Sequence, residues 1–312
     1  MAIFIRSRIL LIKTETVYGT DSVPTGSLNA VLAKDVTIST MEGQDVERDL
    51  DLPYFGNTGS IPADLHRKIS FKVELEPSGT AGTAPAWGAA LRACGMSETS
   101  VALTSVTYAA VTDNPQSATI YFWVGNTRYT MPGSRGTVKL MYSKQGIPYL
   151  EFTFTGLFTL PTEVARPMPV TLTGFRDPKI AAARHVPTFT LNGVSTLKLA
   201  ALSLDMGKVV EPRLLINAEE ILITDGREKL DLTIEAEALS LINPFQLAMD
   251  QTKVPLQFIH GTVAGRRATL NVPLLQLARP TSLGESQGVV EWPLQGMPIP
   301  NAGNDQLTLV LT

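Results

Sequence analysis

Two glycines that stand three residues apart, Gly79 and Gly82, suggest a loop that cradles a phosphate in front of a helix. They lie in SGTAGTAPAWGAALRACG, residues 78–95. A dinucleotide-binding loop needs G-x-G-x-x-G and a kinase-type loop needs G-x-x-x-x-G-K-[ST], and neither spacing occurs here. We therefore interpret the stretch as a flexible connection. Pro85 then opens a short helix that stops at Gly95.

The other reactive side chains form no catalytic set. The histidines are far apart in the sequence, and none has a second histidine or a cysteine close by: His66, His185 and His260. The motifs of zinc enzymes and of serine hydrolases do not occur. We expect neither an enzyme nor a metal or cofactor site.

Two pairs of glutamates stand on strand-like segments, Glu74 with Glu76 and Glu235 with Glu237. Residues i and i+2 of a strand lie about 6.6 to 7 Å apart, a separation that the two carboxylates of a glycosidase can also have. Lysines and threonines share this face, and no aromatic platform for a sugar accompanies it. We interpret the pairs as part of a solvated polar face.

The composition is that of a globular chain without a basic surface for nucleic acid. The 312 residues are 44% hydrophobic and 18% charged, with a formal net charge of −3. Proteins that grip duplex DNA concentrate Lys and Arg to neutralise phosphates. The single cysteine, Cys94, excludes an intramolecular disulfide. No apolar run approaches the ~18 residues of a membrane span, so we expect no membrane partner and a cytoplasm-like compartment.

Strand-like alternation dominates, and one pattern of strands occurs twice. KISFKVELE (68–76) matches KLDLTIEAE (229–237) position by position, with apolar residues on one face and charged residues on the other. Further matches pair DVTIST (35–40) with AALSLD (200–205), RGTVKL (135–140) with RATLNV (267–272), and EFTFTG (151–156) with EWPLQG (291–296). A short helix is expected after each of the segments 68–76 and 229–237, around Trp87 in the first case and after Asn243 in the second. Three strands are expected after each helix.

The repeat predicts a mainly β protein of two similar β-sandwich domains, each with a short flanking helix. We place the domains at residues 1–165 and 166–312, with the Pro-rich segment 160–178 at the boundary. The competing interpretation is a chance resemblance of generic strands. A long loop follows the first strand of each domain, at 41–67 and 206–228. Because apolar side chains crowd the first loop, we expect it to contact a partner rather than fold back on its own domain.

The first third of the chain resembles the tail tube proteins (major tail proteins) of long, flexible-tailed bacteriophages. The resemblance covers residues 13–95, from KTETVYGTDSVPTG to APAWGAALRACG. Four elements carry it together: Tyr18-Gly19-Thr20, Val46-Glu47-Arg48, Gly79-Thr80-Ala81-Gly82 and Pro85-Ala86-Trp87-Gly88. The C-terminal half lacks these elements, so its assignment depends on the repeat.

This resemblance implies a virion protein that stacks in rings around a channel for DNA. Two similar domains per chain suggest that three chains supply six equivalent units, a trimer that mimics a hexamer. The resemblance also implies three partners, a tape-measure protein, a tail terminator and a distal tail protein, and assembly in the host cytoplasm. Double-stranded DNA would pass through the lumen without sequence preference.

Two sets of residues are expected to serve this assembly. The first set lies in the loop 41–67 and would make contacts between subunits or rings: Asp45, Glu47, Arg48, Asp49, Asp51, Leu52, Tyr54 and Phe55. The second set would face the lumen: Glu74, Glu76, Glu235 and Glu237. Two alternatives stay open. One is a six-chain ring whose second domain is an outer decoration, and the other is a β-sandwich module that binds a capsid or glycans.

Overall fold

The computed structural model describes residues 3–312, and within them the protein is mainly β, as the sequence predicts. The N-terminal half, up to residue 165, contains β1 (Arg8–Thr14), β2 (Ala30–Val31), β3 (Lys34–Glu47), β4 (Ser60–Glu74), α1 (Gly88–Ala93), β5 (Met96–Val101), β6 (Ser105–Ala110), β7 (Ala118–Val124), β8 (Thr127–Ser143), β9 (Tyr149–Leu157) and β10 (Thr162–Glu163). The C-terminal half contains β11 (Thr188–Leu191), β12 (Leu199–Asp205), β13 (Lys208–Leu215), β14 (Ala218–Gly226), β15 (Lys229–Glu235), α2 (Pro244–Met249), β16 (Lys253–His260), β17 (Ala268–Leu277), β18 (Gly284–Ser286), β19 (Val289–Pro298) and β20 (Thr308–Leu311).

The long strand β8 links two sheets of the N-terminal half. Its first part pairs with β7, and its second part, from Arg135 to Met141, pairs with β9. Alternating apolar residues fill the space between these sheets, as expected for strands with one buried face. Phe71, Phe152 and Phe154 stack with ring centroids 5.3 to 6.0 Å apart. The core therefore fixes the bend of β8 and the direction of the strands beside it.

The order of paired strands is the same in the two halves. In the N-terminal half it is β1–β7–β8–β9–β4–β3, and in the C-terminal half it is β11–β16–β17–β19–β15–β12. The helices α1 and α2 follow equivalent strands, β4 and β15. A duplication of one β unit predicts this recurrence. The domain boundaries remain a prediction.

Two details of the predicted repeat are wrong. A hairpin, β5–β6, lies between α1 and β7, so six strands, β5 to β10, follow the first helix instead of three, and five strands, β16 to β20, follow the second. The match of 135–140 with 267–272 joins the equivalent strands β8 and β17 but is wrong in register, because the first segment is the part of β8 that pairs with β9, whereas the second is the part of β17 that pairs with β16 and β20. Short strands with one apolar face resemble one another too closely for sequence spacing alone to fix their register.

The glycine-rich loop before α1 needs its glycines for close approach of backbone. Gly82 has φ of +74°, and a Cβ there would lie 2.3 Å from the carbonyl oxygen of Val101. The amide of Gly79 donates a hydrogen bond of 3.0 Å to the carbonyl of Gly265 in the C-terminal half. This loop is thus a packed contact between the halves. The predicted C-terminal end of α1 and the predicted cap of α2 hold, since Gly95 after α1 has φ of +73° and Asn243 accepts from the amide of Gln246. The predicted start of the first helix at Pro85 is wrong, because α1 begins at Gly88.

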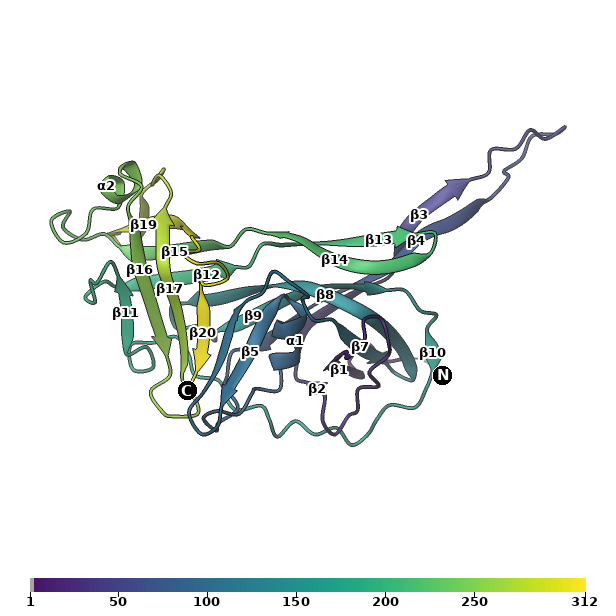
Figure 1. Ribbon diagram of the computed structural model, residues 1–312, viewed down its shortest axis with the longest axis horizontal. Helices are drawn as coiled ribbons and strands as arrows, with labels where there is room; N and C mark the ends of the chain where they lie inside the picture. Colours follow the sequence, from purple (N-terminus) through teal and green to yellow (C-terminus); the bar gives the residue numbers. More distant parts are fainter. Residues whose placement is uncertain (1–2) are drawn as a thin grey trace.

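Strand pairing joins the two halves. β12 pairs antiparallel with the end of β8, and β20 pairs with β6. Residues 164–187, which contain most of the predicted boundary segment, form no helix or strand and connect the halves. Figure 1 shows the C-terminal half on the left, joined to the N-terminal half by strands that run across the molecule. The sheet β3–β4–β9–β8–β12–β15–β19 is therefore continuous.

One titratable side chain is buried near the place where the halves meet. His260 ends β16, is 1% exposed, and lies against the Tyr142 ring of β8, with 5.5 Å between centroids. Burial, the largest cause, and the charge of the nearby His185 together lower the pKa of His260 to about 4. The imidazole is therefore held neutral in the folded protein.

This burial predicts loss of stability in mild acid. The unfolded chain binds a proton at His260 near pH 6.5, whereas the folded chain does so only near pH 4. Stability from this group is complete above pH 6.5 and declines as pH falls towards 4, by up to about 3 kcal/mol. Urea unfolding at several pH values should show the decline. The variant His260→Phe should flatten it in this window, whereas His66→Gln, at a more exposed histidine, should leave it unchanged.

Candidate assembly surfaces

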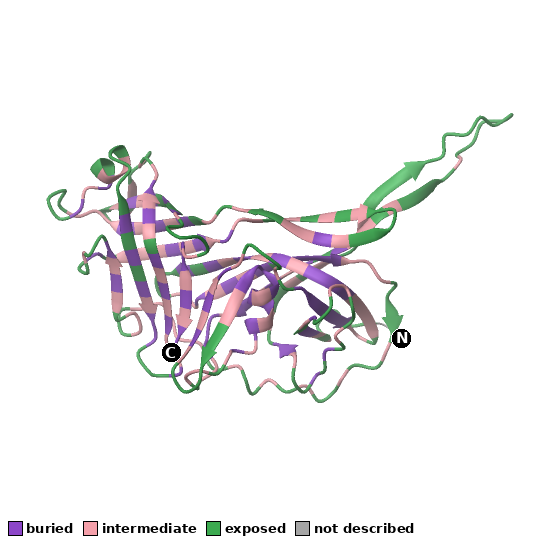
Figure 2. Ribbon diagram, in the orientation of Figure 1, coloured by how far each residue is buried: buried purple, intermediate pink, exposed green. Residues whose placement is uncertain are grey.

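The segment 41–67, predicted to be a long loop, is an arm made of two strands. β3 and β4 pair out to Glu47 opposite Ser60, and residues 48–59 form the tip. This first arm, residues 41–67, projects away from both halves in Figure 1, and it is exposed along nearly all of its length in Figure 2. Its apolar side chains therefore lack a cover within the chain.

Every residue predicted to make assembly contacts lies on the exposed part of this arm. Asp45 and Glu47 belong to β3, and the other six belong to the tip: Arg48, Asp49, Asp51, Leu52, Tyr54 and Phe55. Leu52, Tyr54 and Phe55 are 38, 69 and 108% exposed. Within residues 3–312 none of the charged members takes part in an ion pair. The whole set is free to meet another molecule.

A buried arginine holds the root of the first arm. Arg67 is fully buried and donates hydrogen bonds to the carbonyl oxygens of Thr40, Thr130 and Thr159, at 2.7 to 3.0 Å. Its guanidinium also lies over two aromatic rings, 5.3 Å from the centre of the Tyr129 ring and 5.1 Å from the centre of the Phe158 ring. Burial lowers the pKa of Arg67. Its guanidinium has five N–H donors in a fixed planar arrangement, so this one side chain can bind several backbone segments. The arm is therefore rigid at its base.

The counterpart segment 206–228 is also an arm, β13–β14, but it packs against the N-terminal half of the same chain. Ile221 is fully buried, its amide donates to the hydroxyl of Tyr18, and its carbonyl accepts from Arg135 at 2.8 Å. The Arg135 guanidinium lies 4.7 Å from the centre of the Tyr18 ring. We call residues 206–228 the second arm. Tyr18, one of the residues that carry the family resemblance, thus receives the second arm.

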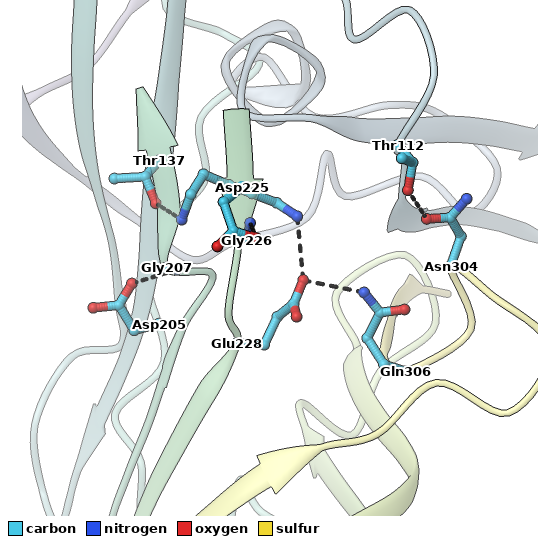
Figure 3. Close-up of polar contacts among 10 residues, drawn as sticks. Thr112, Thr137, Asp205, Gly207, Asp225, Gly226, Glu228, Asn304 and Gln306 are labelled. Carbon is cyan, nitrogen blue, oxygen red and sulfur yellow. Dashed lines mark hydrogen bonds and ion pairs between the residues drawn. The ribbon is translucent and has the colours of Figure 1, made fainter. Parts of the chain in front are cut away.

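A polar network fixes the root of the second arm (Figure 3). Lys208 and Glu228 form an ion pair of 3.2 Å, with side chains only 9 and 7% exposed. Glu228 also accepts from the amide of Gln306 at 3.1 Å, and the backbone amide of Lys208 donates to the Thr137 hydroxyl at 3.2 Å. The network joins both ends of the arm to β8 and to the segment before β20.

The four predicted lumen glutamates separate into two groups. Glu76 is buried, accepts from the amide of Lys179 at 2.8 Å, and lies 3.6 Å from Arg266. Burial, the largest cause, raises its pKa. The prediction for Glu76 is wrong, because β4 ends at Glu74 and segments of the C-terminal half cover the next residues. Glu74, Glu235 and Glu237 are partly exposed, and Glu235 pairs with Lys198 at 2.6 Å.

The polar face of the continuous sheet carries a row of alternating charge. Directly opposed residues on five neighbouring strands are Lys72, Glu151, Lys139, Asp205 and Lys229. Lys72 lies 3.6 Å from Asp35, and Lys229 lies 3.1 Å from Asp231. Opposite charges that face each other across strands are favourable. This face is balanced in sign, and it is not the acidic surface that the glutamates alone suggested.

Comparison with known proteins gives these surfaces a context. No curated protein matches the chain. A family model described as phage tail tube protein matches residues 6–310, nearly the whole chain. The chain belongs to the phage tail tube protein family. The match includes the C-terminal half, which the resemblance of residues 13–95 did not reach.

Membership places this tail tube protein in the virion tail, with a structural role. Proteins of the family assemble with one another into a tube and associate with other tail proteins. An enzyme is therefore the wrong interpretation of its carboxylates. Within residues 3–312, no helix is long and apolar enough to cross a membrane.

Several residues that position the arms were not identified from the sequence. Arg67, Lys208 and Glu228 looked like ordinary surface charges, because each stands in a polar stretch. Their burial follows from segments distant in the chain, at Thr130, Thr159 and Gln306. The sequence did single out Tyr18, because it belongs to the elements that carry the family resemblance. Its contact with Ile221 could not be predicted, since the two residues are 203 positions apart in the chain.

The root of the second arm generates a stability prediction. Glu228→Ala leaves Lys208 without its partner in a buried site, and breaking such a pair costs about 3 kcal/mol or more. Replacing both, with Lys208→Met and Glu228→Leu, should recover most of that loss because no charge remains buried. Urea denaturation measures the change. Glu219→Ala, on the exposed part of the same arm, is the matched control and should change stability by less than about 0.5 kcal/mol.

Proposed function

We propose that three copies of this tail tube protein close into a ring that resembles a hexamer, and that the rings stack into the tube of a long-tailed phage. Each copy would supply two equivalent units, residues 1–165 and 166–312. The stacked rings enclose a channel through which the double-stranded genome passes. A tape-measure protein, a tail terminator and a distal tail protein are the expected partners in this assembly.

One observation carries this proposal, the pairing of β12 with β8. Asp205, Ser203 and Ala201 face Lys139, Met141 and Ser143, so one half continues the sheet of the other. The two halves have the same strand order, and therefore the contact inside the chain is a template for the contact between chains. A repeated head-to-tail contact of this kind closes into a ring when its rotation permits.

The first arm is suited to contact between rings. Its tip extends beyond the fold and exposes Leu52, Tyr54 and Phe55. Exposed ion pairs contribute ~0–1 kcal/mol each, so Asp45, Glu47, Arg48, Asp49 and Asp51 set specificity more than strength. Burying the two aromatic rings against a partner supplies most of the stabilisation.

The polar face of the continuous sheet is the proposed wall of the channel. Glu74, Glu235 and Glu237 stay candidates for this wall, and Lys72, Lys139 and Lys229 stand among the acidic groups. Such a wall offers no dense basic surface to which phosphates would adhere.

Two rivals make different use of the same chain. In a six-chain ring with an outer decoration, the C-terminal half needs no sheet in common with the N-terminal half, yet β12 extends that sheet. A glycan-binding module presents several aromatic rings together on a broad face, but the three tryptophans, Trp87, Trp123 and Trp292, are 1 to 5% exposed, and the exposed rings of Tyr54 and Phe55 lie at the tip of the first arm. The trimeric ring is therefore the better supported proposal.

Electron microscopy of the concentrated protein, with averaged end-on views, tests the ring. We expect true threefold and approximate sixfold symmetry, because three chains carry six similar units. Strict sixfold rings with outer knobs would support the decoration model instead. Persistent monomers, even with tail-tip proteins added as initiators, would contradict the proposed function.

The tip of the first arm generates a second prediction. Replacing Tyr54 and Phe55 together by alanine removes the largest exposed apolar area of the tip, so rings should form but tubes should shorten strongly or fail to grow. Both side chains are exposed in the monomer, so its melting temperature should not change. Tube length on micrographs is the measurement. Val263→Ala, at another exposed apolar residue, should leave tubes at normal length; normal tubes from the double variant would refute the stacking role.

A further inference from the structure

A lysine, a glutamate and a glutamine meet at the root of the second arm, and all three side chains are nearly buried. The Oε1 of Glu228 lies 3.2 Å from the Nζ of Lys208 and 3.1 Å from the Nε2 of Gln306. The Lys208 and Glu228 side chains are 9 and 7% exposed, and Gln306 is 8% exposed. Figure 3 shows the Gln306 side chain pointing toward Glu228. One carboxylate oxygen therefore holds an amine and a carboxamide next to each other.

An amine and a carboxamide in this arrangement can form an amide bond between two side chains, an isopeptide bond. In water a lysine is protonated and so is not nucleophilic, and a carboxamide is a poor electrophile. A carboxyl group between the two removes both obstacles, because it takes a proton from the ammonium group and gives one to the amide. Burial favours the transfer, since a neutral amine and a neutral acid are easier to desolvate than two charges.

The fold fixes the position of the Lys208 amine. A Cβ on Gly226 would lie 2.5 Å from the Lys208 Nζ, so only a glycine at this position leaves room for the amine. The backbone amide of Lys208 donates to the Thr137 hydroxyl at 3.2 Å, and the amide of Gly207 donates to the Asp205 carboxylate at 2.8 Å. The turn into β13 is thus held on both sides of the lysine.

The glutamine is fixed from the other side. The Thr112 hydroxyl donates to the side chain of Asn304 at 2.8 Å, which anchors the segment that leads into Gln306 (Figure 3). Leu307 and Met206 are 1 and 2% exposed, and both line an apolar cavity of only about 20 Å³. The segments before β20 and before β13 therefore converge on the same part of the core, which keeps water away from the three polar side chains.

The carboxamide oxygen has no structural use in this arrangement. The Oε1 of Gln306 is buried, and within residues 3–312 no donor lies within hydrogen-bond distance of it. A glutamine that served only to pack or to bridge would have both ends satisfied. A half-turn of the carboxamide brings this oxygen to Glu228, which donates a hydrogen bond to it when protonated and so polarises the carbonyl that the amine attacks.

We propose that Lys208 and Gln306 join in an intramolecular isopeptide bond. The Lys208 Nζ bonds to the Cδ of Gln306, and the bond from Cδ to Nε2 breaks. Two protons of the Lys208 ammonium group pass through Glu228 to the leaving nitrogen, which departs as ammonium. Glu228 is a carboxylate again at the end. The exchange conserves oxidation state, and every atom it needs is in the chain.

The bond would tie the second arm covalently to β20. It closes a loop from residue 208 to residue 306, and such a closure stabilises a fold by restricting the unfolded chain, as a disulfide does. β20 also pairs with β6 of the N-terminal half. The bond therefore reinforces the place where the two halves meet, and it forms within one chain whether or not rings assemble.

Mass spectrometry of the purified full chain tests the bond. After prolonged incubation of the folded protein, the intact mass should be lower than that of the sequence by one ammonia. Trypsin should release residues 199–213 joined to residues 268–312, because a cross-linked Lys208 is not cleaved and trypsin does not cut before Pro280. An unchanged intact mass, or a loss of ammonia that maps to other residues, would overturn the proposal even if every variant failed to fold.

Three variants assign the roles. Lys208→Arg keeps a cation beside Glu228 but cannot attack, so it should retain the full mass. Glu228→Gln keeps the shape of the side chain but carries no proton, so cross-linking should slow by about a hundredfold or more. The matched control is Lys198→Arg, at an exposed lysine that pairs with Glu235, and it should cross-link like the unchanged chain.

Ammonia loss at the normal rate in Lys208→Arg or Glu228→Gln would contradict the assigned chemistry. The stability comparison of Glu228→Ala with the double variant at this root refers to chain that has not reacted, which its full mass identifies.

Discussion

The antiparallel pairing of β12 with the end of β8 is the contact from which the rest of the architecture follows. It converts two similar β units into one sheet, with opposite charges aligned across the junction at Lys139 and Asp205. It also places the second arm on the N-terminal half, because β13 begins three residues after β12 ends. Without this pairing the two units would be joined mainly by residues 164–187 and by β20 beside β6.

The two arms show how one element acquires different surroundings through its neighbour. Each arm is a hairpin that extends from one of the equivalent strands, the first arm from β3 and the second arm from β12. The second arm finds a unit of its own chain beside it and buries Ile221 there, while the first arm has no such unit and exposes Tyr54 and Phe55. Exposure of the first arm is therefore a property of the single chain, and the contact between stacked rings that we propose would cover its tip.

Sequence reasoning was most successful where structure depends on local pattern. Alternation in 68–76 and 229–237 predicted equivalent strands, and Asn243 and Gly95 marked helix ends, because caps and strand faces are set by neighbouring residues. It failed where the deciding contact is remote. Glu76 continues the polar pattern of its strand, yet Lys179 and Arg266 cover it. The β5–β6 hairpin was also missed, since a strand is recognised by its apolar face and β5 has little of one.

The alternating charges of the sheet also change how the proposed channel would act on DNA. Neighbouring strands lie about 4.8 Å apart, so the sign of the charge repeats every ~10 Å along the row. The potential of a row that alternates in sign decays over roughly its period divided by 2π, about 1.5 Å, which is much shorter than the ~8 Å of salt screening. A phosphate a few ångströms from Lys139 is therefore attracted almost as much as the adjacent Glu151 and Asp205 repel it. Such a wall neither binds nor expels the genome over any distance, so it permits sliding through the absence of a field rather than through repulsion.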